Sequence, residues 1–285
     1  MEKKKLMVHD FVRMKQERRK ITWITSYDYP TAQFAEAAGM DMILVGDSLG
    51  MCVYGYDSTV PVTMDQCIVH CEAVRRAAPN TFVVGDMPLG SYQVSDEEAA
   101  RNAIRFIKEA GVDAIKLEGG KRVISRIKAI LDSGIVVIGH IGLTPQSSGQ
   151  IGGHKAQGRT AESARLVIED ALAIEEVGAH MLLIEAVPPE VSGFIARKLK
   201  IPVLSIGAGG ECDGQLLIVS DVIGQFTAFT PKFVKQYANV AEVITNALRE
   251  YIKDVKTGAF PTNAHCYHMI KGEEDKLQQL IKEYE

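Results

Sequence analysis

Four acidic side chains each end a short apolar run of this sequence. Asp47 ends "MILVGD", Asp86 ends "FVVGD", Glu118 ends "AIKLE" and Glu185 ends "MLLIE". A buried carboxylate without a partner is costly, so an acid in such a place needs a partner. A single acid at the end of an apolar run carries little information, but four of them indicate a shared site.

Three of these acids have the chemistry of a metal site. Asp47, Asp86 and Glu118 follow successive apolar runs, and carboxylate oxygens are the ligands that Mg²⁺ prefers. Such a metal, chelated by a 2-oxo acid, acts as a Lewis acid that stabilises an enolate. Lys116 stands two residues before Glu118, on the same side of an extended chain, where its ammonium can face the substrate. The alternative is that the acids form salt bridges or cap helices.

Three further residues are candidates for contact with a substrate. Glu185 lies apart from the other acids along the chain and suits a general base, because burial raises the pKa of a carboxyl group. The alternative for Glu185 is a supporting partner of a lysine or histidine. His140 in "GHIGLTPQ" has the groups to bind a substrate oxygen, or it is structural. Ser48, next to Asp47, either binds a carboxylate or caps a helix.

Eight apolar runs alternate with segments of helical periodicity, and this rhythm predicts how the side chains are positioned. The runs lack the polar alternation of half-exposed strands, as expected when both faces are covered. Eight such units predict a (β/α)8 TIM barrel, whose catalytic groups lie at the carboxyl ends of the strands. A doubly wound open sheet is the alternative, but no GxGxxG motif follows the first run. The predicted strands are 21–28, 41–48, 81–86, 113–120, 135–142, 180–187, 201–209 and 216–224.

The same pattern predicts the helices and the division of the chain. An N-terminal helix at 8–19 precedes the barrel and caps it, and the segment 210–215 holds at most one helical turn. We expect one domain over 1–285, with the barrel at about 21–256 and a C-terminal helical extension at 257–285. The other predicted helices are 30–38, 64–77, 96–110, 121–132, 161–177, 189–199, 232–256 and 272–285.

Composition excludes several classes of function. The chain has 36 acidic and 32 basic residues, which gives no electrostatic footprint for nucleic acid or an anionic membrane. The five cysteines form no disulfide pattern, and no apolar segment suits a secretory signal or a membrane span. We therefore expect a cytoplasmic protein. Cys67 and Cys71, one helical turn apart, are interpreted as buried thiols in preference to metal ligands.

Two glycine-rich loops give weaker signals. "SIGAGGECDG" (205–214) follows the seventh run, where barrels often bind phosphate or another anion. Its glycines alternatively only shape a turn. "IGGHKAQGR" (151–159) follows the fifth run and is either a mobile flap or a solvated loop.

A series of motifs resembles the ketopantoate hydroxymethyltransferase family in content and order. The resemblance covers about residues 8–268 and implies a barrel of the phosphoenolpyruvate/pyruvate superfamily. The motifs are "VGDSLGM", "GYDSTVPVTMD", "GDMPLGSY", "KLEGG", "GHIGLTPQ", "GGHKAQGR", "LLIEAVP", "IGAG" and "DGQLLIVSD".

The resemblance implies a Mg²⁺-dependent enzyme of pantothenate synthesis. Such an enzyme transfers a hydroxymethyl group from 5,10-methylenetetrahydrofolate to 3-methyl-2-oxobutanoate, giving 2-dehydropantoate and tetrahydrofolate. It also implies a homo-oligomer, a decamer of two stacked pentameric rings. The implied roles are metal binding for Asp47, Asp86 and Glu118, substrate binding for Asp47, Ser48, Asp86, Lys116 and His140, and proton acceptance for Glu185.

Some positions depart from the family pattern, and two other functions compete. Leu89, His154 and Cys266 stand where we expect Phe, an aromatic residue and Ser, and 269–285 lie beyond the resemblance.

One rival is a related lyase or phosphoenolpyruvate mutase with the same metal and enolate chemistry, although the lyase signature "KKCGH" is absent. The other is a barrel that binds a metabolite without chemistry, which the presence of all three acids disfavours.

Overall fold

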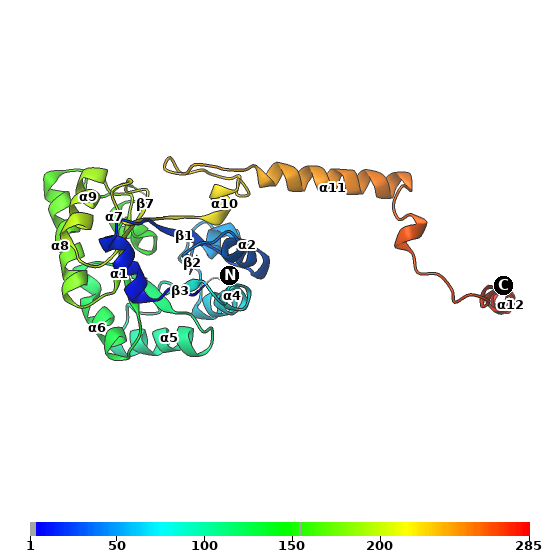
Figure 1. Ribbon diagram of the computed structural model, residues 1–285, viewed down its shortest axis with the longest axis horizontal. Coiled ribbons are helices and arrows are strands. Elements are labelled where there is room, and N and C mark those ends of the chain that lie inside the picture. Colours follow the sequence, from blue (N-terminus) through cyan, green and yellow to red (C-terminus); the bar gives the residue numbers. More distant parts are fainter. Residues whose placement is uncertain (1–3, 154) are drawn as a thin grey trace. The chain divides into compact units, whose positions relative to one another are not determined.

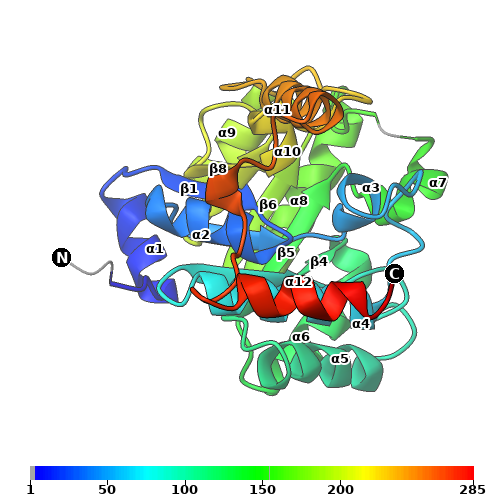
Figure 2. The ribbon, with the colours of Figure 1, turned by 90° about the vertical axis from the view of Figure 1, so that its right-hand side faces the viewer.

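The computed structural model describes residues 4–153 and 155–285, and its centre is a closed barrel of eight parallel strands (Figures 1 and 2). Neighbouring strands pair in sequence order, and β8 pairs with β1 to close the barrel. This confirms the predicted (β/α)8 fold. The strands are β1 Ile21–Thr25, β2 Met42–Val45, β3 Phe82–Asp86, β4 Ala114–Glu118, β5 Val137–Gly142, β6 Met181–Glu185, β7 Val203–Ile206 and β8 Gly214–Leu217.

Burial on both faces explains why the strand sequences do not alternate. Every residue of β2, β3 and β4 is buried, because one face meets the barrel interior and the other meets the helices. The interior is filled by large side chains that include Trp23, Phe82 and Leu183. Helix α1 (Val8–Gln16) adds Phe11 to this cluster, with its ring edge-on to Phe82 at a centroid distance of 5.1 Å. The N-terminal helix therefore caps the barrel as predicted.

The outer helices begin at the residues that their caps indicate. The side chains of Asp28, Thr63, Ser95 and Thr160 each accept a backbone N–H in the first turn of the helix that follows. Figure 1 shows these helices outside the strands. The helices of the barrel are α2 Tyr29–Ala37, α3 Leu49–Cys52, α4 Met64–Ala77, α5 Asp96–Lys108, η1 Lys121–Val123, α6 Ile124–Asp132, η2 Pro145–Ser147, α7 Ser148–Ile151, α8 Ala161–Glu176, α9 Pro189–Lys198 and α10 Val219–Val222.

Strand register brings the chemistry-bearing residues side by side. Asp86 on β3 is paired with Lys116 on β4, and Glu118 on β4 is paired with His140 on β5. Glu185 on β6 is paired with Gly142 on β5. Asp86, Glu118 and Glu185 are the last residues of their strands, and Lys116 and His140 lie two residues before the ends of theirs, so the barrel collects these side chains at one mouth.

The eighth strand was predicted at 216–224, and this range is wrong. Strand β8 begins earlier because Gly214 lets β1 approach closely: a Cβ there would lie 2.4 Å from the Ile21 carbonyl oxygen. The strand ends at Leu217, and the N–H of Val219 donates to Thr25 Oγ1 as α10 begins. The second half of the apolar run is therefore a helical turn.

The last long helix was predicted at 232–256 but begins at Val240, as α11 Val240–Thr257. The preceding segment leaves the helical path because the N–H of Tyr237 donates to the carbonyl of Val222. No helix lies between β7 and β8 in the described part of the chain, in agreement with the weak seventh unit.

The chain divides into two compact units, Met1–Ala238 and Asn239–Glu285. The first unit contains the whole barrel. The second contains α11, η3 Asn263–His265 and α12 Glu274–Lys282, and within it Phe260 packs against Tyr251 and His265. The C-terminal helical extension is thus present, whereas the single domain over 1–285 stays a prediction. No helix among the described residues has the length and apolar character to cross a membrane.

Candidate active site

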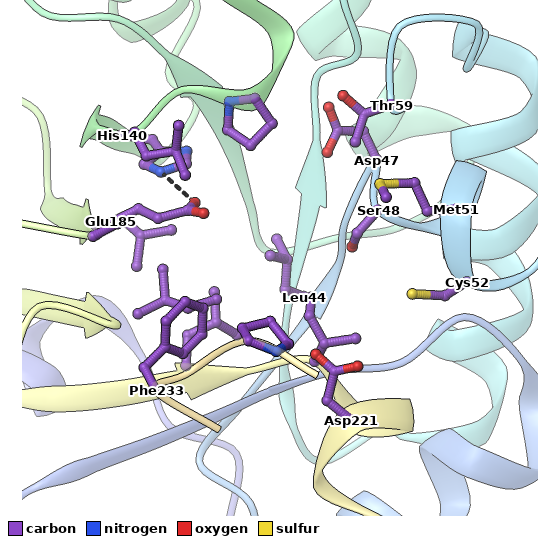
Figure 3. A pocket seen from close by; sticks show the side chains of 18 of the residues that line it. Leu44, Asp47, Ser48, Met51, Cys52, Thr59, His140, Glu185, Asp221 and Phe233 are labelled. Carbon is purple, nitrogen blue, oxygen red and sulfur yellow. Dashed lines mark ion pairs between the residues drawn. The ribbon is translucent and has the colours of Figure 1, made fainter. Parts of the chain in front are cut away.

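A pocket of about 530 Å³ opens at the carboxyl ends of the strands (Figure 3). All the residues that the sequence predicted for the site line it, so the barrel brings them together as expected. They are Asp47, Ser48, Asp86, Lys116, Glu118, His140 and Glu185.

A buried ammonium group stands among the acids. Lys116 Nζ lies 2.7 Å from Asp86 Oδ1 and 3.9 Å from Glu118 Oε1. Burial disfavours its charge, but the carboxylates of Asp86, Glu118 and Asp47 outweigh burial and raise the pKa of Lys116. The lysine is therefore a fixed cation at neutral pH.

His140 is neutral, and its two nitrogens have different neighbours. Burial and the Lys116 ammonium hold the pKa of His140 well below its usual value. Lys116 Nζ lies 3.3 Å from His140 Nδ1, and an ammonium only donates hydrogen bonds, so Nδ1 is the acceptor. The ring proton is then on Nε2, which lies 3.1 Å from Glu185 Oε2 without the alignment of a hydrogen bond (Figure 3).

The backbone around Glu185 is tightly constrained. The carbonyl of Glu185 accepts from the N–H of Leu143, and a Cβ on Gly142 would lie 2.3 Å from that carbonyl oxygen. Ala186 follows with a φ of 48°, a left-handed conformation that non-glycine residues adopt at some cost. The strand end is therefore held in one geometry, which directs the Glu185 side chain into the pocket.

Burial makes Glu185 a stronger base than an ordinary glutamate. Burial raises its pKa to about 8; Lys116 opposes the rise, and Asp47 and Asp86 add to it. A carboxyl group with a pKa near the working pH combines a useful ionised fraction with basicity, which suits general base catalysis.

The acids that follow β2 and end β3 and β4 are all buried. Burial raises the pKa of Asp86 to about 7, with Lys116 opposing, and raises that of Glu118 well above its usual value. In residues 4–153 and 155–285, no group of three or more His, Cys, Asp or Glu is spaced to hold a metal ion. The donor chemistry still suits Mg²⁺, since the carboxylates of Asp47, Asp86 and Glu118 are hard oxygen donors that line the same pocket. The three-acid metal site stays a prediction.

Gln146 connects the acids, and sequence reasoning missed it. Its Nε2 donates to Asp47 Oδ2 and to the Met87 carbonyl, both at 2.9 Å, and its backbone N–H donates to Glu118 Oε2 at 3.1 Å. Its Oε1 accepts from the Tyr92 hydroxyl at 2.7 Å. Both partners of Nε2 only accept, so the amide has a single orientation. The signal in the sequence was the polar end of "GHIGLTPQ".

Ser48 faces the pocket beside Asp47 (Figure 3). Its hydroxyl lies 2.7 Å from the Tyr27 hydroxyl. It stands at the N-cap of α3 but makes no side-chain cap hydrogen bond. The hydroxyl therefore does not serve as a helix cap.

Several other sequence signals have structural outcomes. Cys67 and Cys71 are buried free thiols, and burial raises both pKa values well above the usual range. In the 205–214 loop, Lys20 Nζ donates to the carbonyls of Gly210 and Cys212, so these groups face a cation and not an anion. His154 of the 151–159 loop lies outside the described residues.

The chain is similar over most of its length to proteins of one family. Residues 5–263 match the family model described as ketopantoate hydroxymethyltransferase. A 3-methyl-2-oxobutanoate hydroxymethyltransferase of Alkaliphilus metalliredigens is 64% identical over 281 residues, covering 99% of each chain. One from Geobacillus sp. (strain WCH70) is 54% identical over 264 residues, covering 93% of this chain and 95% of the relative.

Solved structures confirm the fold class. Phosphoenolpyruvate phosphomutase from Streptomyces platensis subsp. rosaceus has a TM-score of 0.60 at 15% identity and covers 98% of each chain. At this identity the likeness concerns the fold alone. The family match over most of the sequence, in contrast, is specific: the chain belongs to the ketopantoate hydroxymethyltransferase family.

Proposed function

We propose that the protein transfers a hydroxymethyl group from 5,10-methylenetetrahydrofolate to 3-methyl-2-oxobutanoate, giving 2-dehydropantoate and tetrahydrofolate. This reaction serves pantothenate synthesis and hence coenzyme A. The observation that carries the proposal is the Glu185 carboxyl group, which has a raised pKa and faces a pocket whose other wall holds Lys116 and the strand-end acids. Removal of a proton next to a carbonyl needs a base and positive charge near the oxygen.

In this mechanism each residue of the site has its own role. Ser48 and Lys116 bind the substrate carboxylate and keto oxygen, with Asp47 and Asp86 beside them. Glu185 removes the proton from C3, and the Nε2–H of neutral His140 lies close to Glu185 Oε2, at 3.1 Å. The resulting enolate carbon attacks the methylene carbon of the folate's iminium form, and the new C–C bond replaces the second bond of the C=N group. Water then supplies the hydroxyl oxygen as the remaining C–N bond breaks, and the nitrogen of the departing tetrahydrofolate takes up the proton.

The proposal includes Mg²⁺, held by Asp47, Asp86 and Glu118. All three side chains offer hard oxygen donors at the ends of adjacent strands, which supports a hard cation at this place. A bound Mg²⁺ supplies a Lewis acid that polarises the substrate carbonyl. Lys116 provides positive charge at the same acids independently of the metal.

A cytoplasmic homo-oligomer, a decamer of two stacked pentameric rings, completes the proposal. Phe34 on α2 is 70% exposed and Val69 on α4 is 61% exposed, and α2 and α4 are neighbours. Exposed apolar side chains on outer helices favour burial against another subunit. Native mass spectrometry tests this, because a decamer has ten times the 31.2 kDa chain mass.

The reaction is tested by product formation. Purified protein, Mg²⁺, 3-methyl-2-oxobutanoate and folate carrying a ¹³C-labelled methylene group should yield 2-dehydropantoate with the label in its hydroxymethyl carbon. Label that stays in the folate after long incubation would contradict the proposal. Cleavage of a 2-hydroxy acid without folate would instead favour the lyase rival.

A further inference from the structure

One of the carboxylates that line the pocket has no task in the mechanism above. Asp221 lies on α10, after β8, and its side chain lines the same pocket. Figure 3 shows it at the edge of the pocket away from His140 and Glu185, with its carboxylate directed inward. In the part of the chain that the structure describes, no hydrogen bond or ion pair reaches this carboxylate, although the residue is only 6% exposed.

Such a carboxylate calls for a ligand with hydrogen-bond donors. Burial raises the pKa of Asp221 to about 6, which means that the protein itself offers its charge no compensation. A buried polar group without a protein partner is costly, and a ligand that donates to it relieves this cost. Unlike Asp86, Asp221 has no lysine at ion-pair distance among the described residues.

The surroundings of Asp221 suit a flat ring system. Phe226, Phe229 and Phe233 line the pocket and come from the segment that follows α10. Phe233 packs closely on Gly207, where an added Cβ would lie 2.5 Å from the ring. The pocket volume of about 530 Å³ suits a ligand well beyond the size of a five-carbon oxo acid.

We propose that Asp221 binds the pterin ring of the folate co-substrate through the adjacent N3–H and 2-amino groups. This inference rests on the proposed function, since it assigns the second substrate of the same site. The two N–H donors of a 2-amino-4-oxopyrimidine point in parallel and match the two oxygens of one carboxylate, as an arginine fork does. The phenylalanines cover the ring faces, and the one-carbon unit is directed toward the acids and Glu185.

The test compares Asp221→Asn with the native protein in two assays. Asn keeps the shape but places an amide nitrogen against one of the ring donors. We expect the KM for 5,10-methylenetetrahydrofolate and the Kd for tetrahydrofolate to rise by about tenfold to a hundredfold. The KM for 3-methyl-2-oxobutanoate, and the folate-free exchange of its C3 proton with solvent, should stay within about twofold of native. Asp132→Asn, on the exposed end of α6, is the control for loss of one negative charge.

A ligand variant tests the same contact without a mutation. A tetrahydrofolate analogue that lacks the 2-amino group should bind the native protein about tenfold or more weakly than tetrahydrofolate, and bind Asp221→Asn no worse than native. Equal binding of both folates by the native protein overturns the inference, as does an Asp221→Asn protein with unchanged folate affinity. Failure of the proposed function looks different, because the native protein would then form no labelled product.

Discussion

The charge state of Glu185 has a measurable consequence for stability. In the folded protein burial raises its pKa to about 8, against an ordinary value of 4.5. Below pH 4.5 the group is protonated in both folded and unfolded states, and its contribution to stability is fully present. As the pH rises from 4.5 to 8, the unfolded chain releases this proton while the folded protein keeps it, so the native protein loses stability.

Glu185→Gln removes this titration while keeping the shape of the side chain. The difference between the two pKa values corresponds to about 4–5 kcal/mol in total, of which about 3 kcal/mol falls between about pH 4.5 and pH 7. The stability of Glu185→Gln relative to the native protein should therefore increase by about 3 kcal/mol over this interval. A carboxylate held by a salt bridge has a lowered pKa and stabilises the folded protein more as the pH rises, so its effect on stability has the opposite sign.

Equilibrium urea unfolding from about pH 4.5 to pH 9, with EDTA present, measures the difference. EDTA keeps divalent metal away from the acids that influence Glu185. Glu190→Gln, at an exposed position on α9, controls for the amide substitution itself. A free-energy difference between Glu185→Gln and native protein that does not change with pH would refute the raised pKa and, with it, the argument that Glu185 is a strengthened base.

Two further substitutions probe the support of the site. Gly142→Ala should lower unfolding stability by more than about 2 kcal/mol and slow C3 proton exchange, since its Cβ would meet the Glu185 carbonyl oxygen. Gly134→Ala, at a positive φ with open space around it, is the control, and an equal effect of both would sink this explanation. Gln146→Leu should cost about 1–3 kcal/mol in urea unfolding and weaken Mn²⁺ binding measured by electron paramagnetic resonance, because Asp47 loses its buried donor. Native-like metal affinity in that variant would remove Gln146 as a positioning residue.

The barrel and the main site residues were predictable from the sequence for one physical reason. Strands covered on both faces appear as continuous apolar runs, and the first polar residue after each run marks the carboxyl end. The parallel strands close into a barrel, and this brings Asp47, Asp86, Glu118 and Glu185 to one mouth, whatever their distance along the chain.

Features that depend on contacts between distant elements were not predictable in this way. Gln146 is important because its amide reaches Asp47 and Met87, and nothing near it in the sequence signals these partners. Strand β8 begins early because Gly214 lies close to Ile21 of β1. A pattern of apolar residues along the sequence gives no information about such a contact. Asp221 ends the motif "DGQLLIVSD", but its part in the site is indicated only by its burial without a partner in the described part of the chain.

The central claim is that Glu185 removes the C3 proton of 3-methyl-2-oxobutanoate. Proton NMR in D₂O with the purified protein and Mg²⁺ follows the C3 signal directly, first without folate and then with 5,10-methylenetetrahydrofolate. The account predicts that this signal disappears with native protein, that EDTA stops its loss, and that Glu185→Gln leaves it intact while 2-dehydropantoate forms only with native protein. A Glu185→Gln protein that exchanges the proton at the native rate would contradict the account.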